Sequence, residues 1–177
     1  VENARFFEYV NAQNLKPIQL VLTHAHLDHV FGINWVHQQY GLTPILHQAD
    51  KFIYDNAANV TRQYGLKMDD LIETDLGLED GTVLEFGETI FDILHAPGHS
   101  PGSVCFYNRK EEYVIAGDVL FEGSIGRTDL PGGDFDTLIR SIKSQLMVMS
   151  DDVLVYSGHG PLTTIGQERI SNPYLQA

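Results

Sequence analysis

The stretch "THAHLDH", Thr23 to His29, decides the fold, because it places three histidines and an aspartate directly behind the apolar run "IQLVL". His24, His26 and Asp28 are spaced by two residues, so in an extended segment their side chains project to the same side. His29 then begins a predicted helix. Imidazole and carboxylate groups are typical ligands of zinc and similar first-row metals, and the absence of thiolates indicates a catalytic rather than a structural site. The stretch therefore predicts part of a metal site at a strand end.

Three further apolar runs stop at a potential ligand beside a glycine. "IFDILHAPGH" ends at His99, "YVIAGD" at Asp118 and "VLVYSGH" at His159. Strand ends can converge at one edge of a sheet, and loops on a rigid scaffold commonly carry functional groups. With the opening stretch they supply five histidines and two aspartates, which exceed the needs of one tetrahedral ion. Two ions that share one carboxylate are the simplest arrangement.

Not every histidine fits this pattern. A histidine at a strand end is usually an ordinary polar residue, so the whole set of seven residues, and not any single member, indicates a metal site. His37 and His47 are interpreted as surface or structural residues. His95 precedes His99 by four residues and could orient a ligand, although a core or surface position is the favoured interpretation.

The hydrophobic pattern alternates helices and strands, which predicts an α/β fold in which two packed mixed sheets carry helices on their outer faces. Phe6, Phe7 and Val10 share one face of the first predicted helix, and Phe52, Ile53 and Val60 are core candidates of the third. We expect helices at 2–13, 30–40, 49–64 and 135–149, and strands at 16–24, 43–47, 82–86, 90–95, 103–107, 113–117 and 152–158.

Composition narrows the functional classes. The 177 residues fit one domain, 1–177, and the 24 acidic against 11 basic residues give a formal net charge of -13. Nucleic acid and anionic membranes are therefore poor partners.

Cys105 is the only cysteine, and its apolar neighbours predict a core residue. No apolar run approaches the roughly 20 residues of a membrane helix, so we expect a soluble chain. The expected location is the cytoplasm. Because Val1 enters a helical pattern midway, we also expect a truncated N-terminus.

Four motifs, "THAHLDH", "HAPGHSPGS", "GDVLF" and "GHGP", together resemble the metallo-β-lactamase superfamily, and specifically its glyoxalase II-like branch. The resemblance runs from about residue 17 to the C-terminus. It implies an αββα sandwich, of which this chain lacks the opening strands. It also implies two divalent ions, with zinc the first expectation and iron or manganese the alternatives. The matching ligands are His24, His26 and His99 for the first ion, Asp28, His29 and His159 for the second, and Asp118 as the bridge.

The resemblance implies hydrolysis of a small-molecule thioester, with a glutathione conjugate as a candidate substrate. In that chemistry a metal-bridging hydroxide attacks the thioester carbonyl, and Asp28 and Asp118 are the expected catalytic residues. Asp28 would orient the hydroxide in addition to binding metal. Because true metallo-β-lactamases lack a bridging aspartate at the position of Asp118, hydrolysis of antibiotics is disfavoured.

Arg127 is the expected substrate-binding residue. The resemblance places it where glyoxalase II has a lysine that helps to hold glutathione, so the positive charge is kept. Asp129 stands where that family has a tyrosine, and Gly160 and Pro161 replace a tyrosine-bearing turn. The helical C-terminal domain of glyoxalase II has no counterpart in the 18 residues after His159. The sequence therefore leaves the thiol part of the substrate open.

Two other hypotheses remain. A persulfide dioxygenase of the same superfamily uses a single iron, and its ligands would match His24, His99 and Asp118. This ranks second, because the other ligand-type residues would then be idle. A non-enzymatic metal-binding module is the third possibility, and in it the loss of His29 or Asp118 would leave function intact.

Overall fold

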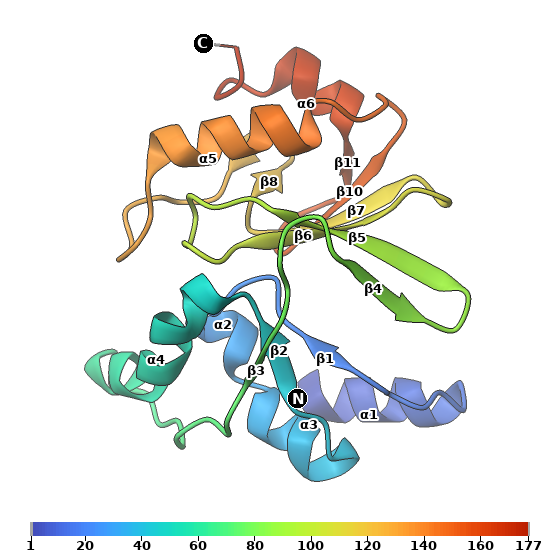
Figure 1. Ribbon diagram of the computed structural model, residues 1–177. Helices are drawn as coiled ribbons and strands as arrows, with labels where there is room; N and C mark the ends of the chain where they lie inside the picture. Colours follow the sequence, from blue (N-terminus) through green and yellow to red (C-terminus); the bar gives the residue numbers. More distant parts are fainter. Residues whose placement is uncertain (1, 177) are drawn as a thin grey trace.

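The chain forms two facing sheets with helices on the outer side of each, as Figure 1 shows. The computed structural model describes residues 2–176, with side chains from residue 4 onward. The predicted αββα fold class is confirmed. Mixed strand directions occur in the larger sheet, whereas the described strands of the smaller one are parallel.

The smaller sheet has the order β1-β2-β3. Its outer face carries the first four helices (Figure 1), and Gly41 ends α3 in a left-handed conformation that suits a residue without Cβ. The return from α3 to β2 is therefore short, and β2 lies parallel to β1. The elements are α1 (Glu2–Ala12), β1 (Leu20–Val21), α2 (Leu27–Val30), α3 (Ile33–Tyr40), β2 (Pro44–Leu46), a 3₁₀ turn (Gln48–Asp50), α4 (Lys51–Gln63) and β3 (Asp75–Leu76).

The larger sheet has the order β11-β10-β7-β6-β5-β4. Its neighbours are antiparallel except for β7 and β10, which run parallel. Asp134 caps α5 by accepting a hydrogen bond from the backbone N–H of Thr137 at 2.7 Å. The elements are β4 (Val83–Phe86), β5 (Thr89–His95), β6 (Val104–Asn108), β7 (Tyr113–Gly117), a hairpin of β8 (Leu120–Phe121) and β9 (Ser124–Ile125), α5 (Phe135–Ser141) with a π-helical continuation (Ile142–Leu146), β10 (Leu154–Ser157), β11 (Thr163–Thr164) and α6 (Ile165–Ser171).

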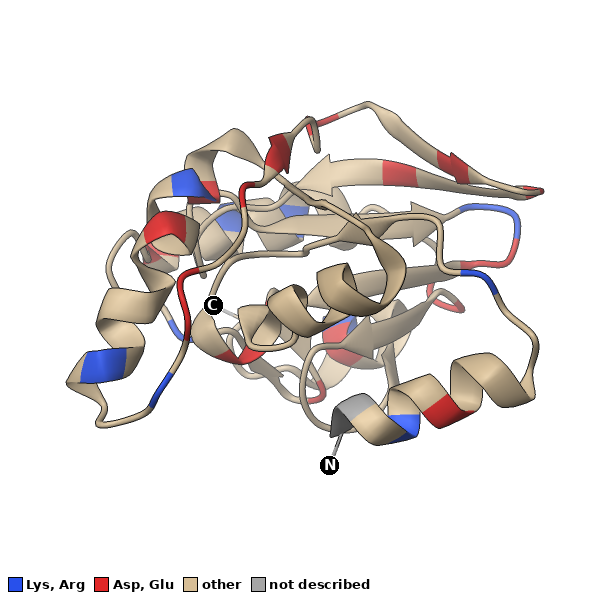
Figure 2. Ribbon diagram, turned by 90° about the horizontal axis from the view of Figure 1, so that it is seen from below, with Lys and Arg blue, Asp and Glu red and all other residues tan. Residues whose placement is uncertain are grey.

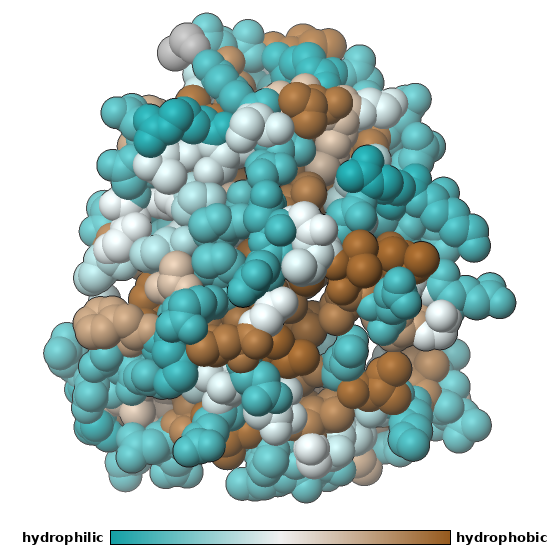
Figure 3. Space-filling model, viewed as in Figure 1, coloured by the Kyte–Doolittle hydropathy of each residue, from teal (hydrophilic) through white to brown (hydrophobic). Residues whose placement is uncertain are grey.

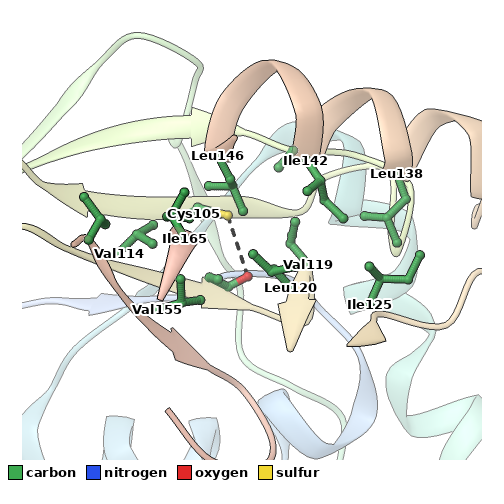
Figure 4. Close-up of a cluster of buried hydrophobic side chains, with 13 residues drawn as sticks. Cys105, Val114, Val119, Leu120, Ile125, Leu138, Ile142, Leu146, Val155 and Ile165 are labelled. Atoms are coloured by element: carbon green, nitrogen blue, oxygen red, sulfur yellow. Dashed lines mark hydrogen bonds between the residues drawn. The ribbon is translucent and has the colours of Figure 1, made fainter. Parts of the chain in front are cut away.

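The largest core cluster lies between this sheet and α5. Figure 4 shows Leu138, Ile142 and Leu146 directed from the helix toward the strands, and all three are fully buried. Cys105 is also buried, as predicted, with its thiol 3.6 Å from the carbonyl oxygen of Ala116. Burial raises the pKa of this thiol to about 12, so it remains protonated and packs as a small apolar group.

Several element predictions need correction. The strand expected at 16–24 is reduced to two residues. The helix expected at 30–40 begins only at Ile33, as α3, and the separate short helix α2 precedes it. Phe52 is wrong as a core candidate, because 72% of its surface is exposed and α4 buries Tyr54 instead. Phe6 and Phe7 are also exposed, although both make edge contacts with Trp35. The strands β3, β8, β9 and β11 and the helix α6 were not predicted.

The surface is acidic, and an apolar groove lies beside the larger sheet. Figure 2 shows the basic residues distributed over separate elements, among acidic ones, on the side that it presents. In Figure 3 apolar side chains gather at the height of the sheets. A groove of about 600 Å³ is lined by Tyr113, Ile115 and Tyr156 and reaches Thr23 and His29. Among residues 2–176, no helix has the length and apolar character needed to cross a membrane.

We predict that Ile142→Ala destabilises the chain by about 2–5 kcal/mol, because it removes a fully buried side chain and leaves a cavity in the core. Ile170→Ala is the matched control, since 79% of the Ile170 surface is exposed, and it should change stability by less than about 0.5 kcal/mol. Urea unfolding followed by circular dichroism measures both. Equal effects of the two substitutions would contradict the assignment of the core.

Candidate metal centre

The seven predicted ligands lie together where strands of both sheets end. β1 leads to the loop and short helix that carry His24 and His29, and the turn after β5 carries His99. β7 and β10 are parallel neighbours, so the residues that follow them, Asp118 and His159, emerge at the same edge of the sheet. The side chains form two groups, each with its potential ligand atoms within 4.8 Å of one another: His24, His26 and His99; and Asp28, His29, Asp118 and His159.

The first group consists of three imidazoles. His99 Nε2 lies 2.8 Å from His26 Nδ1 and 3.2 Å from His24 Nε2. His24 and His99 are almost fully buried, and His26 is half-buried. Three converging imidazole nitrogen atoms match the donor set of a catalytic metal site that keeps one position open.

The second group is more exposed and contains both carboxylates. Asp28 Oδ2 lies 2.8 Å from His159 Nε2 and 3.6 Å from His29 Nε2. Asp28 and His159 each have 56% of their side chain exposed, whereas His29 has 18%. This group therefore opens toward solvent, on the side from which a substrate could approach.

Asp118 lies between the two groups. Its Oδ1 is 3.4 Å from His29 Nε2 in the second group. Its Oδ2 is 3.6 Å from His99 Nε2 in the first group and 3.6 Å from His159 Nε2 in the second. One carboxylate thus has an oxygen facing each group, which is the geometry required of a shared ligand.

The charge states suit cation binding. Burial, followed by repulsion from neighbouring imidazoles, strongly lowers the pKa of His24 and lowers that of His26 to about 4. Burial also lowers the pKa of His99. Near neutral pH these rings are uncharged, so their nitrogen lone pairs are available. Burial raises the pKa of Asp118, but the interaction of its carboxylate with the side chain of His29 outweighs this effect, so the pKa is lowered and the carboxylate is ionised.

Two buried atoms in the second group lack a hydrogen-bond partner: His29 Nε2 and Asp118 Oδ1. Their separation of 3.4 Å lacks hydrogen-bond geometry, and unpaired buried polar atoms are costly. Gly158 leaves the room that this arrangement needs, because a Cβ there would collide with Asp118 Oδ1 and approach His29. Unpaired nitrogen and oxygen atoms beside a glycine fit a bound divalent cation.

Neighbouring groups orient the buried imidazoles. Thr23 Oγ1 lies 3.1 Å from His24 Nδ1, and the carbonyl oxygen of Arg127 lies 2.8 Å from His99 Nδ1. Because the hydrogen bond is made at Nδ1, the lone pair of Nε2 faces inward in each ring and is available to bind a metal ion. Such outer contacts fix both the tautomer and the direction of a ligand.

The side chain of Arg127 is committed to a neighbour. Its guanidinium donates two hydrogen bonds of 2.7 Å to Asp129, and both side chains are exposed. Arg127 holds the pKa of Asp129 at about 2 by this hydrogen bonding. The predicted substrate-binding residue therefore stands at the edge of the first group, with its charge already paired.

The other histidines belong to neither group. His37 Nδ1 lies 2.9 Å from the carbonyl oxygen of Leu42. His47 stacks on His95 with 4.1 Å between ring centroids, and His95 Nε2 lies 2.9 Å from the carbonyl oxygen of Pro101.

Sequence reasoning missed one residue beside the site, the buried carboxylate Asp50 in the 3₁₀ turn after β2. It accepts hydrogen bonds from the backbone N–H of Ala25 and of Gly102, which belong to two different ligand-bearing loops. The parallel pairing of β1 and β2 brings it to this edge. That pairing leaves no local signal in the sequence around Asp50.

Comparison with known proteins identifies related chains. The sequence pattern of the metallo-beta-lactamase superfamily matches residues 1–159. The hydroxyacylglutathione hydrolase GloC of Haemophilus influenzae is 38% identical over 99% of this chain and 84% of its own length. The crystal structure of TTHA1623 in a di-iron-bound form has a TM-score of 0.89 at 38% identity, covering 97% of this chain and 84% of that one. For BLEG-1 B3 metallo-beta-lactamase the TM-score is 0.88 at 37% identity, with 99% and 85% covered.

We predict that His26→Ala and His159→Ala each lower the metal content of the purified chain from about two ions to about one, because each removes a donor from a different group. His37→Ala should retain about two ions, since His37 lies outside both groups. Elemental analysis after removal of loosely bound metal provides the count. Retention of two ions by all three variants would refute the assignment of the groups.

Proposed function

The chain belongs to the metallo-beta-lactamase superfamily, whose members include metal-dependent hydrolases, and we propose that it is a dinuclear thioesterase of the hydroxyacylglutathione hydrolase type. The observation that carries the proposal is the position of Asp118, which faces both groups of ligands. Two ligand groups that share one carboxylate suit a hydrolase with two metal ions, whereas a site with one ion would leave one of the groups unused. The 38% identity to GloC supports the thioester part.

Bound divalent ions would supply Lewis acidity, which lowers the pKa of water and polarises a carbonyl group. The protein residues determine where this occurs. His24, His26 and His99 form the buried side of the centre, and Asp118 keeps its negative charge between the groups. Asp28 reaches solvent, so its carboxylate can accept a hydrogen bond from the attacking water and orient it. A thiolate leaves readily, so the chain needs no strong acid beside the leaving group.

We expect zinc in both groups, with iron or manganese as alternatives, because all three accept imidazole and carboxylate ligands. The di-iron-bound form of TTHA1623 shows that a chain 38% identical to this one holds iron. The substrate we propose is a small thioester, with a glutathione conjugate the first candidate. The negative charge of the chain continues to argue against nucleic acid and anionic membranes as partners, and a cytoplasmic location stays a prediction.

We predict that the metal-loaded protein hydrolyses S-lactoylglutathione and that removal of metal by a chelator abolishes the activity. Asp118→Asn should lower kcat by at least about 100-fold, because substitutions beside a metal ligand already cost 10- to 100-fold. Asp136→Asn is the control, since Asp136 is exposed in the first turn of α5. Thiol release from the thioester measures the rate. Unchanged kcat in Asp118→Asn would contradict the proposal.

Two rival activities are tested in the same preparation. The 37% identity to BLEG-1 B3 metallo-beta-lactamase makes a β-lactam the first rival substrate. Persulfide dioxygenation is the second, and it predicts about one iron per chain and oxygen uptake with glutathione persulfide. Faster turnover of the β-lactam, or oxygen uptake without thioester hydrolysis, would overturn the thioesterase proposal.

Asp129 provides a test of the substrate site. We predict that Asp129→Ala lowers KM for S-lactoylglutathione about two- to fivefold with kcat unchanged, because the Arg127 guanidinium becomes free to pair with a substrate carboxylate. A thioester without a carboxylate should show no change in KM, and Arg127→Ala should raise KM for the glutathione substrate alone. If Asp129→Ala raises KM for both substrates, Arg127 does not bind the glutathione moiety.

A further inference from the structure

Asp50 is the buried carboxylate that joins the two loops of the first ligand group. It lies at the start of α4, and its side chain is completely inaccessible to solvent. Oδ2 accepts a hydrogen bond of 2.9 Å from the backbone N–H of Ala25 and one of 2.8 Å from Ser100 Oγ. Oδ1 accepts one of 2.5 Å from the backbone N–H of Gly102. Both oxygens are therefore satisfied by neutral donors.

These donors adjoin all three ligands of the first group. Ala25 stands between His24 and His26, and Ser100 directly follows His99. The two loops are far apart in the sequence, so their relative position depends on contacts that cross between them. A carboxylate that accepts from both loops restricts the distance between His26 and His99, whose facing nitrogen atoms are 2.8 Å apart.

The site is shaped around this carboxylate. A Cβ on Gly102 would lie 2.6 Å from the backbone nitrogen of Asp50, so the loop approaches it more closely than a side chain would permit. Ser103 Oγ lies 2.8 Å from Ser100 Oγ and holds the hydroxyl on the same side. Hydrogen bonds to a charged acceptor are stronger than hydrogen bonds between neutral groups. The bonds to Asp50 therefore restrict the movement of the two loops relative to each other.

Charge adds to the geometric effect. Burial lowers the pKa of His26 and of His99, and the negative charge of Asp50 acts in the opposite direction on both rings. The negative charge of Asp50 also favours the binding of a cation among these imidazoles. Of the segments that carry the second group, Asp50 contacts only the stretch that Asp28 and His29 share with His24 and His26, and none of the hydrogen bonds described for it reaches the loops of Asp118 or His159.

We infer that Asp50 is a positioning residue that holds the His24, His26 and His99 loops in ligating geometry, so that its loss weakens metal binding at the first group and spares the second. The inference rests on the proposed two-ion centre. It assigns to Asp50 no contact with substrate. Its effect on catalysis is exerted through the three histidines.

The test is a titration of the metal-free protein with Co²⁺, followed by its absorption spectrum, in Asp50→Asn and in the matched control Asp55→Asn. Asp55 is an exposed carboxylate on the same helix and pairs with Lys51. We expect Asp50→Asn to weaken one of two binding steps about 10- to 100-fold and to change the other less than about twofold. Asp55→Asn should leave both steps unchanged.

Double variants show which ion is affected. In a His26→Ala background, Asp50→Asn should add little further loss, because both substitutions act on the same group. In a His159→Ala background, it should weaken the remaining step by the same 10- to 100-fold. Unchanged affinities in Asp50→Asn, or equal weakening of both steps, would overturn the inference. A wild-type chain that binds fewer than two ions would instead refute the proposed function.

Ser100→Ala keeps the test decisive if Asp50→Asn does not fold. It removes one of the three donors and leaves the carboxylate in place. We expect it to weaken the same binding step by a smaller factor, about three- to tenfold, and to leave the other step unchanged. No change in either step, in a folded Ser100→Ala protein, would contradict the inference.

Discussion

The central constraint on this molecule is the packing of five imidazoles and two carboxylates into one space between the ends of the strands. Such a set is unfavourable unless a positive charge is present, because burial and mutual repulsion keep the first three rings neutral and leave their lone pairs facing one another. His29 Nε2 and Asp118 Oδ1 are buried without hydrogen-bond partners at the same place. The fold therefore maintains a cation-binding arrangement at a cost that a bound cation offsets.

The sheets make this arrangement possible. Parallel pairing of β1 with β2 and of β7 with β10 delivers residues distant in sequence to one edge. The core between the larger sheet and α5 holds the strands rigid, and Gly158 lets the chain pass close to Asp118. The sheets bring the loops of Ala25 and Gly102 close together, and Asp50 then connects them by hydrogen bonds. The division into a buried first group and an open second group follows from the same geometry.

The convergence of the candidate ligands could be predicted from sequence, because they cluster just beyond the ends of apolar runs and have side chains of distinctive chemistry. His24, His99 and Asp118 carry that signal locally. Asp50 could not be found in this way, since its role depends on pairing between strands. Phe52 was misplaced because its apolar character suggested burial, whereas the packing of α4 turns Tyr54 inward. The two-residue strands β8, β9 and β11 are too short for a periodic pattern.

A crystal structure of the metal-loaded protein, with anomalous diffraction data collected at the absorption edge of the metal, tests the central claim most directly. The account predicts two anomalous peaks in each chain. One should be bounded by His24, His26 and His99, and the other by Asp28, His29 and His159, with the Asp118 carboxylate between them. A single peak in a fully loaded crystal, or two peaks with Asp118 facing only one of them, would contradict the account.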